Sequence, residues 1–332
     1  MWSIRSTRVL VTLSAAALTA GLVPAALAGA APSQRNVARI VTAKTVTQHR
    51  VDLTVDSPSM SEKVKVTVLT PGGDAPRPSL YMLDGADAGE DVSDWITKGG
   101  AARYFAGRNV NVVLPAGGAA SFYTNWESRD AKVGKPQWET FLTKELPPLI
   151  DAKFAGSGRN GVLGLSMGGQ SAFALATRNP TLYQGVASLS GCPPVSGPAN
   201  EAYVRTTLAK SGADATKMWG TPGGATWQAH DPARRIDALR GKAIFLSSGS
   251  GAIGPLDLAA EFDPKEGPED AQMAAGSALE VGANRCSLEF ATQLRANNVP
   301  FKSNFRLIGT HRWDYWKQDL PLAWQALAPA LG

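Results

Sequence analysis

One serine of this chain lies in a pattern that fits a nucleophile. Ser166 stands between Gly164 and Gly168, after the apolar run 161–165 and before a stretch of small residues. In a Gly-x-Ser-x-Gly turn from strand to helix, the glycines permit a sharp bend that exposes the serine hydroxyl at the end of a sheet. The same bend aims the amide of the next residue, Met167, at the oxyanion of an acyl-transfer reaction. The sequence therefore predicts that Ser166 is a catalytic nucleophile.

A serine hydroxyl needs a base, and the chain has three histidines. His49 precedes the serine among polar residues, and we interpret it as a solvated strand position. His311 follows the last predicted strand and precedes the C-terminal helical stretch, where a loop at the end of the sheet would bring it to the serine. We expect His311 to be the base, and His230, at a turn-like helix entry, is the alternative.

An acid that orients the base falls between serine and histidine in the chain order of this fold. Asp257, Glu261 and Glu280 all follow the apolar run 243–246. Each of them could also be an ordinary solvated charge, so the residues alone leave the acid open.

These groups need a sheet whose strand ends converge. Residues 51–56 and 63–68 alternate apolar with polar side chains, which predicts an antiparallel pair of half-buried strands. Later, short apolar runs alternate with helical stretches, which is typical of a parallel sheet. The apolar runs are 80–83, 110–114, 161–165, 185–189, 243–246 and 301–307, and the helical stretches are 138–154, 170–179, 285–298 and 314–331. We expect an α/β-hydrolase fold with a mostly parallel, doubly wound sheet in a single domain.

The composition is that of a globular protein with an export signal. Of 332 residues, 44% are hydrophobic, enough for a sizeable core, and the formal charge of +5 is too small for a nucleic-acid-binding protein. Arg5 and Arg8 precede an apolar stretch that ends in Ala28-Gly29-Ala30. This predicts a signal peptide over residues 1–30, a working domain over 31–332, and a secreted or cell-wall-associated protein. A retained membrane anchor is the alternative.

Three His and two Cys in no zinc-binding spacing predict no metal and no cofactor. An oxidising compartment permits one disulfide between Cys192 and Cys286, which we predict. Two separately buried thiols are the alternative, because the sequence does not bring their Cα atoms within bonding distance.

Several runs beyond the serine turn resemble one family. Over about residues 62–325, the chain is similar to the antigen 85 family of secreted mycolyltransferases and their corynomycolyl relatives. The most specific runs are Ser-Phe-Tyr-Thr-Asn-Trp at 121–126 and Thr-His-Arg-Trp-Asp-Tyr-Trp at 310–316. The others are Leu83-Asp84-Gly85, 91–95, 114–118, 138–143 and 164–168.

The resemblance implies a role for each group of the reaction. It implies that Ser166 is acylated, that His311 is the base, and that the amides of Met167 and Ala86 form the oxyanion hole. Glu280 matches the family's acid best, although the match needs a one-residue gap.

It also implies a sugar site. Asp84 and Trp313 correspond to positions that line the family's trehalose site, and Trp126 belongs to an aromatic run that borders the serine. The chain departs from the family at two positions, since Ala86 stands where mycobacterial members carry Leu and Asp87 where they carry an Arg that helps to hold the sugar.

The expected function is a secreted serine acyltransferase that moves a long, mycolyl-type acyl group from a trehalose ester to a sugar hydroxyl. The implied partners are a glycolipid or sugar ester, such as a trehalose monoester, and a cell-wall glycan acceptor. A secreted carboxylesterase that hydrolyses lipid or sugar esters is the alternative. A non-catalytic cell-surface binding protein is disfavoured, because serine, base and candidate acid follow one another in the expected order.

Overall fold

The computed structural model describes residues 1–2 and 37–332. The chain divides into two units, Met1–Gln34 and Arg35–Gly332, and every described helix and strand belongs to the second. Apart from Met1 and Trp2, the predicted signal peptide lies outside the described residues. Within residues 37–332, none of the helices combines the length and the apolar character that a membrane span requires.

The described residues form one nine-stranded sheet in the order β1-β2-β3-β5-β4-β6-β7-β8-β9. β1, β2 and β3 run antiparallel to their neighbours, and the pairs from β5 to β9 are parallel. The strands are β1 (Arg39–Thr47), β2 (Arg50–Ser57), β3 (Glu62–Leu69), β4 (Arg77–Leu83), β5 (Asn111–Pro115), β6 (Gly156–Leu165), β7 (Tyr183–Leu189), β8 (Ala243–Ser248) and β9 (Lys302–Phe305). The predicted antiparallel pair and parallel sheet are confirmed, while the exposed edge strand β1 had not been predicted.

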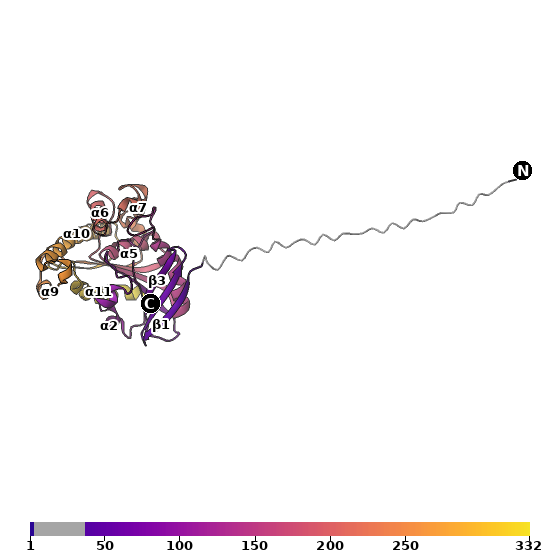
Figure 1. Ribbon diagram of the computed structural model, residues 1–332, viewed down its shortest axis with the longest axis horizontal. Helices are drawn as coiled ribbons and strands as arrows, with labels where there is room; N and C mark the ends of the chain where they lie inside the picture. Colours follow the sequence, from indigo (N-terminus) through magenta and orange to yellow (C-terminus); the bar gives the residue numbers. More distant parts are fainter. Residues whose placement is uncertain (3–36) are drawn as a thin grey trace. The chain divides into compact units, whose positions relative to one another are not determined.

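Helices cover both faces of the sheet (Figure 1). α4 (Leu146–Phe154), α5 (Met167–Arg178) and α10 (Glu269–Ala296) contribute to one apolar cluster, and α2 (Ala101–Phe105) and α11 (Trp313–Leu331) contribute to the other. Along β4, Tyr81 and Leu83 belong to the first cluster whereas Leu80 and Met82 belong to the second, because side chains alternate across a strand. The domain is therefore the single doubly wound α/β domain that the sequence predicts.

The helix that carries Glu280 differs most from the prediction. α10 begins at Glu269 rather than near residue 285, so Glu280 lies within the helix. Gly276 and Gly282 interrupt the helical pattern in the sequence, but a Cβ at Gly282 would lie 3.0 Å from the Tyr203 ring, so close packing accounts for that glycine. The prediction of a helix over 285–298 therefore missed its first half.

Most of the remaining helices are short or close to their predicted places, and the longest that was not predicted is the 13-residue α6. The stretch 138–154 is helical throughout, with the π-helical turn η2 (Phe141–Glu145) between α3 (Trp138–Thr140) and α4. Pro147 falls in the first turn of α4, where a missing amide costs little. The others are α1 (Asp94–Thr97), α6 (Pro198–Lys210), α7 (Ala215–Trp219), α8 (Ala225–Ala229), η3 (Pro232–Leu239), α9 (Pro255–Leu258) and η4 (Pro264–Glu266).

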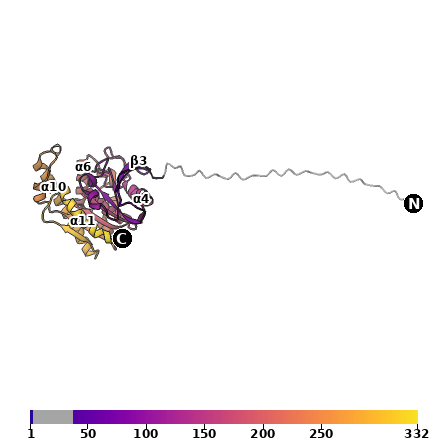
Figure 2. The same ribbon diagram turned by 90° about the horizontal axis from the view of Figure 1, so that it is seen from below.

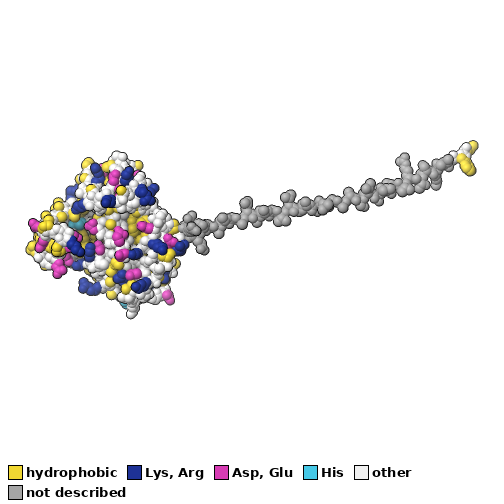
Figure 3. All heavy atoms as spheres, viewed as in Figure 1, with side chains coloured by type: hydrophobic (Ala, Val, Ile, Leu, Met, Phe, Trp, Pro, Cys, Tyr) yellow, Lys and Arg dark blue, Asp and Glu magenta, His cyan; other side chains and the backbone are white. Residues whose placement is uncertain are grey.

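The predicted disulfide is present. It joins Cys192, which follows β7, to Cys286 on α10, with the Cα atoms 5.1 Å apart. In Figures 1 and 2, α10 lies at the end of the domain opposite β3. On the face in Figure 3, Lys and Arg side chains are interspersed with Asp and Glu side chains.

Candidate active site

Ser166 occupies a strained turn between β6 and α5. Its φ is 50° and its ψ is −124°, a backbone conformation that residues other than glycine rarely adopt. The flanking positions must be glycine because a side chain at either one would clash with the backbone. A Cβ at Gly164 would lie 2.1 Å from the Gly168 carbonyl oxygen, and a Cβ at Gly168 would lie 2.3 Å from the Asp84 carbonyl oxygen. The turn therefore holds the serine where β6 meets the end of β4.

The structure brings His311 to this serine. The Nε2 atom of His311 lies 2.8 Å from Ser166 Oγ, and its Nδ1 atom lies 2.7 Å from Glu280 Oε2. Because the Glu280 carboxylate accepts a hydrogen bond at Nδ1, Nε2 is left to accept the serine proton. The three side chains form one hydrogen-bonded chain from acid to nucleophile.

Glu280 is fully buried and has further partners. Its Oε1 atom accepts hydrogen bonds from the Ser190 hydroxyl at 2.7 Å and from the Gly249 amide at 2.5 Å. Such donors stabilise a buried carboxylate, which would otherwise be costly to desolvate. The acid is thereby held in a fixed position against the imidazole.

The other two acid candidates do not contact the imidazole. Asp257 is fully buried and accepts hydrogen bonds from the hydroxyls of Tyr315 and Thr310 and from the Gly254 amide. It therefore ties α9 to both sides of the His311 loop. The exposed Glu261 uses its backbone carbonyl to accept a hydrogen bond from Arg312.

His230, the alternative base, belongs to a separate buried network. Its Nδ1 atom donates to the Thr226 carbonyl at 2.7 Å, and its ring stacks on Trp219. Burial raises the pKa of Glu139, but the neighbouring His230 and Arg178 side chains outweigh it and lower that pKa to about 2. This network packs α3 against α5 and α8 and does not include the serine.

The two residues expected to form the oxyanion hole belong to segments that adjoin the serine. Met167 is the first residue of α5, so its amide has no partner inside the helix. A Cβ at Gly85 would lie 3.6 Å from Ser166 Cβ, so the chain passes beside the serine one residue before Ala86. In the part of the chain that the structure describes, the Ala86 amide has no protein acceptor, while its carbonyl accepts from Ala120.

Two of the three expected sugar-binding side chains are turned into the protein. Asp84 is fully buried and accepts hydrogen bonds from the Asp94 and Trp95 amides at the start of α1, and burial raises its pKa to about 7. Trp126 is 1% exposed and donates to the Ser121 carbonyl, so it packs in the core. The structure therefore gives Asp84 and Trp126 internal roles that differ from the expected sugar contacts.

Trp313 is partly exposed and belongs to an aromatic series that ends at the base. Its ring makes edge contacts with Trp95 and Trp316, and Trp316 makes one with His311. Trp316 also donates from Nε1 to Ser190 Oγ at 2.9 Å. Sequence reasoning missed Ser190, although its place directly after β7, at the same sheet edge as Ser166, was a signal that could have found it.

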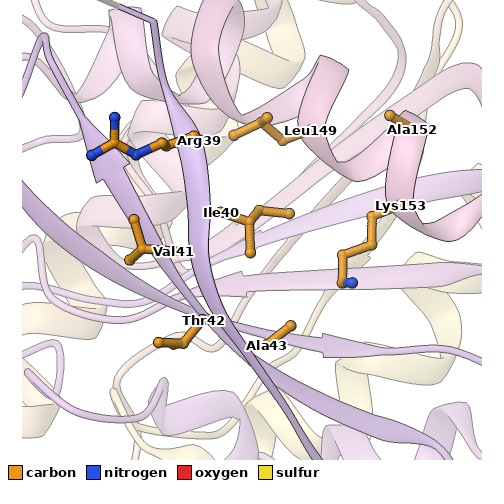
Figure 4. Close-up of a pocket in the computed structure, with 8 residues that line it drawn as sticks. All are labelled: Arg39, Ile40, Val41, Thr42, Ala43, Leu149, Ala152 and Lys153. Atoms are coloured by element: carbon orange, nitrogen blue, oxygen red, sulfur yellow. The ribbon is translucent and has the colours of Figure 1, made fainter. Parts of the chain in front are cut away.

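Two hollows lie away from the serine. A cavity of about 450 Å³ lies between β1 and α4, with Arg39 and Lys153 at its rim and Ile40 and Leu149 among its apolar residues (Figure 4). A second of about 780 Å³ is formed by residues of the segment 260–269, where the Phe262 ring lies under the Arg312 guanidinium at 4.1 Å. Among the described residues, no group of three His, Cys, Asp or Glu side chains could hold a metal ion.

Known proteins resemble this chain in sequence and in fold. A family described as "Putative esterase" matches residues 57–327. The MPT51/MPB51 antigen of Mycobacterium tuberculosis is 39% identical over 183 residues, which are 54% of this chain and 58% of the antigen, so the match spans less than two thirds of that relative. The diacylglycerol acyltransferase/mycolyltransferase Ag85B of Mycobacterium intracellulare is 31% identical over 84% of this chain and 83% of its own length.

Solved structures agree. The crystal structure of Mycobacterium tuberculosis MPT51 is 30% identical, with a TM-score of 0.69, and covers 83% of this chain and 96% of its own. FphF, a fluorophosphonate-binding serine hydrolase of Staphylococcus aureus, has a TM-score of 0.63 at 17% identity and shares the fold. Since the family match spans most of the chain and two Ag85 relatives are 31% and 32% identical over most of their length, the chain belongs to the putative esterases and, within them, to the antigen 85 family of mycolyltransferases.

Proposed function

We propose that this protein is a serine acyltransferase that moves a long, mycolyl-type acyl group from a trehalose ester to a sugar hydroxyl through an acyl-Ser166 intermediate. The observation that carries the proposal is the hydrogen-bonded chain from Glu280 through His311 to Ser166. The names of the Ag85 relatives, diacylglycerol acyltransferase/mycolyltransferase, support the class of reaction.

In the first half-reaction, His311 Nε2 takes the proton of Ser166 while Oγ attacks the ester carbonyl. The amides of Met167 and Ala86 donate hydrogen bonds to the oxyanion, and the Glu280 carboxylate stabilises the imidazolium. The C–O bond to the leaving sugar then breaks, and His311 returns its proton to that sugar oxygen. The products are the free sugar and acyl-Ser166.

In the second half-reaction, an acceptor hydroxyl replaces the leaving sugar. His311 takes its proton as its oxygen attacks the acyl-Ser166 carbonyl, and the same amides hold the second oxyanion. Collapse breaks the bond to Ser166 Oγ, which regains its proton from His311. The acceptor leaves as a new ester and the enzyme is restored.

A carboxylesterase that uses water as the acceptor is the second candidate. It is favoured by the internal hydrogen bonds of Asp84 and by Asp87, an exposed acid where mycobacterial members carry a sugar-holding Arg. Both features weaken the case for a trehalose acceptor and leave the chemistry at Ser166 unchanged.

We further propose that the protein is exported and works in an extracellular or cell-wall compartment, with a cell-wall glycan as acceptor. Two features support export, the charged and apolar start of the sequence and the disulfide, which persists in oxidising compartments.

The acyl-enzyme tests the proposal. We expect brief incubation with a trehalose monoester of a long fatty acid, followed by acid quenching, to add the mass of the acyl group to the peptide that contains Ser166. Ser166→Ala deletes one oxygen from a turn shaped by its glycines, so the variant should fold with an unchanged circular dichroism spectrum and carry no acyl group. An acylated Ser166→Ala protein, or acylation at another residue of the parent, would refute the role of Ser166.

A further inference from the structure

The acid of the proposed site lies at the limit of the packed part of its helix. The buried residues of α10 are Glu280, Ala283, Cys286, Ser287, Phe290, Ala291 and Leu294. None of the residues from Glu269 to the one before Glu280 is buried. Glu280 is thus the first buried residue of a helix whose preceding half is exposed or only half-buried, so most of the packing that holds it comes from its C-terminal side.

This less buried half of α10 is connected to the site by two polar contacts. The Gly276 carbonyl accepts from the His311 amide at 3.1 Å, and the Ser277 hydroxyl donates to the Gly251 carbonyl at 2.6 Å. Both contacts reach loops rather than the sheet, and single hydrogen bonds of this kind contribute only a modest net free energy. They do not by themselves fix Glu280 relative to the strand ends.

One three-residue segment after β7 makes three contacts with α10. Ser190 donates to Glu280, the Gly191 carbonyl accepts from Ser287 at 2.7 Å, and Cys192 is covalently bonded to Cys286. Cys286 is six residues beyond Glu280 on the same helix, and both cysteines are fully buried. The covalent bond therefore joins the helix of the acid to the segment that supplies the acid's hydroxyl partner.

Glu280 also has a competing state. A carboxylate prefers water to a protein interior unless its partners are held in place, and the residues of α10 that precede Glu280 are only partly covered, so solvent lies close to it. If α10 shifted from the Ser190 segment, Glu280 would lose its hydrogen bonds with Ser190, the Gly249 amide and His311 together and regain hydration. A covalent link between the two elements opposes that shift.

We propose that the Cys192–Cys286 disulfide is a positioning element for the catalytic acid, which keeps Glu280 between Ser190 and His311. The proposal rests on the proposed role of Glu280 in the reaction. It assigns the disulfide a catalytic effect in addition to its effect on the unfolded chain.

The test is the rate at which a fluorophosphonate labels Ser166, measured from pH 5 to 9 at a temperature where circular dichroism shows every variant folded. The variants are the pair Cys192→Ala/Cys286→Ala, Glu280→Gln, and the combination of the two. Leu53→Ala is the control, because it removes buried side-chain volume on β2, toward the far edge of the sheet, and lowers stability without touching the site.

We expect the cysteine pair to slow labelling by about tenfold or more and to change the pH profile of labelling in the same way as Glu280→Gln does, since the displaced carboxylate no longer stabilises the imidazolium. The combined variant should be no slower than Glu280→Gln, because both changes remove the same interaction. Leu53→Ala should lower the melting temperature and leave the labelling rate and its pH profile as in the parent.

Two outcomes would overturn the inference. In the first, the reductions in labelling rate caused by the cysteine pair and by Glu280→Gln add up in the combined variant. In the second, the cysteine pair lowers the melting temperature but keeps the labelling rate and pH profile of the parent. In the second case, a slow Glu280→Gln variant would leave the proposed function standing. If Glu280→Gln itself labels like the parent, the proposed role of the acid fails instead.

Discussion

Two buried carboxylates near His311 differ in role because they contact different side chains. Glu280 and Asp257 are both fully buried, and each accepts hydrogen bonds from an amide and from hydroxyls, one for Glu280 and two for Asp257. Glu280 also reaches the imidazole, whereas Asp257 binds residues on either side of it. Burial raises the pKa of Tyr315, and the Asp257 carboxylate raises it further, so this hydroxyl remains a donor at neutral pH.

This difference leads to a prediction at the residue scale. Glu280→Gln should reduce turnover roughly a thousandfold or more, because a neutral amide cannot stabilise the imidazolium. Asp257→Asn should cost about tenfold or less, since an amide oxygen still accepts hydrogen bonds and only the loop that carries His311 is loosened. Steady-state hydrolysis of a chromogenic ester by the two variants compares them, and a larger loss for Asp257→Asn would reverse the assignment of the acid.

At the scale of elements, the turn that carries Ser166 depends on the contact between α5 and the end of β4. Gly168→Ala would place a Cβ 2.3 Å from the Asp84 carbonyl oxygen, which is backbone and has little room to move. We expect a loss of roughly 3 kcal/mol in the free energy of unfolding, together with loss of Ser166 labelling. Gly276→Ala is the matched control, because its Cβ would meet nothing closer than 3.6 Å on a helix, and it should gain about 0.5–1 kcal/mol. Urea unfolding measures the stability of both variants, and equal stabilities of Gly168→Ala and Gly276→Ala would contradict the packing described for the turn at Ser166.

The contact between β4 and α1 has its own pH dependence. Burial raises the pKa of Asp84 from 3.8 to about 7, so the folded protein holds a proton that the unfolded chain releases. The contribution of this group to stability is therefore fully present below its ordinary pKa and is lost as the pH rises to about 7. Asp84→Asn has no such proton to lose. Its free energy of unfolding relative to that of the parent should therefore rise by up to about 4 kcal/mol between pH 4 and pH 8. If the difference in unfolding free energy between the variant and the parent stays constant across this range, Asp84 is ionised in the folded state.

The sequence predicted the elements better than the directions of their side chains. Ser166 and His311 could be assigned because a glycine-flanked turn and a loop after the last strand are local features. Asp84 and Trp126 could not, because whether a side chain faces inward depends on packing between distant segments, here with α1 and with the loop at Ser121. The start of α10 was missed because Gly276 and Gly282 have low helix propensity, whereas the helix is stabilised by the packing of its C-terminal half.

At the scale of the whole molecule, the sheet order assembles the site from distant parts of the chain. β4, β6, β7 and β8 are adjacent and parallel, so their carboxyl ends meet at one edge. That edge supplies Ala86, Ser166, Ser190 and Gly249, to which α10 and the loop after β9 add the acid and the base. The chain order of serine, acid and histidine is fixed by this topology, whereas the acceptor depends on side chains at the rim.

The measurement that tests the central claim most directly is the partition of products from a long-chain trehalose monoester, with and without added trehalose or arabinose oligomers. The account predicts that a sugar diester or an acylated acceptor is the main product, that its share rises with acceptor concentration, and that Ser166→Ala forms none. Long chains should react faster than short ones, since contacts along the chain supply binding energy to the reacting ester. Free fatty acid as the main product at every acceptor concentration, with short esters cleaved as fast as long ones, would contradict acyl transfer and identify a carboxylesterase.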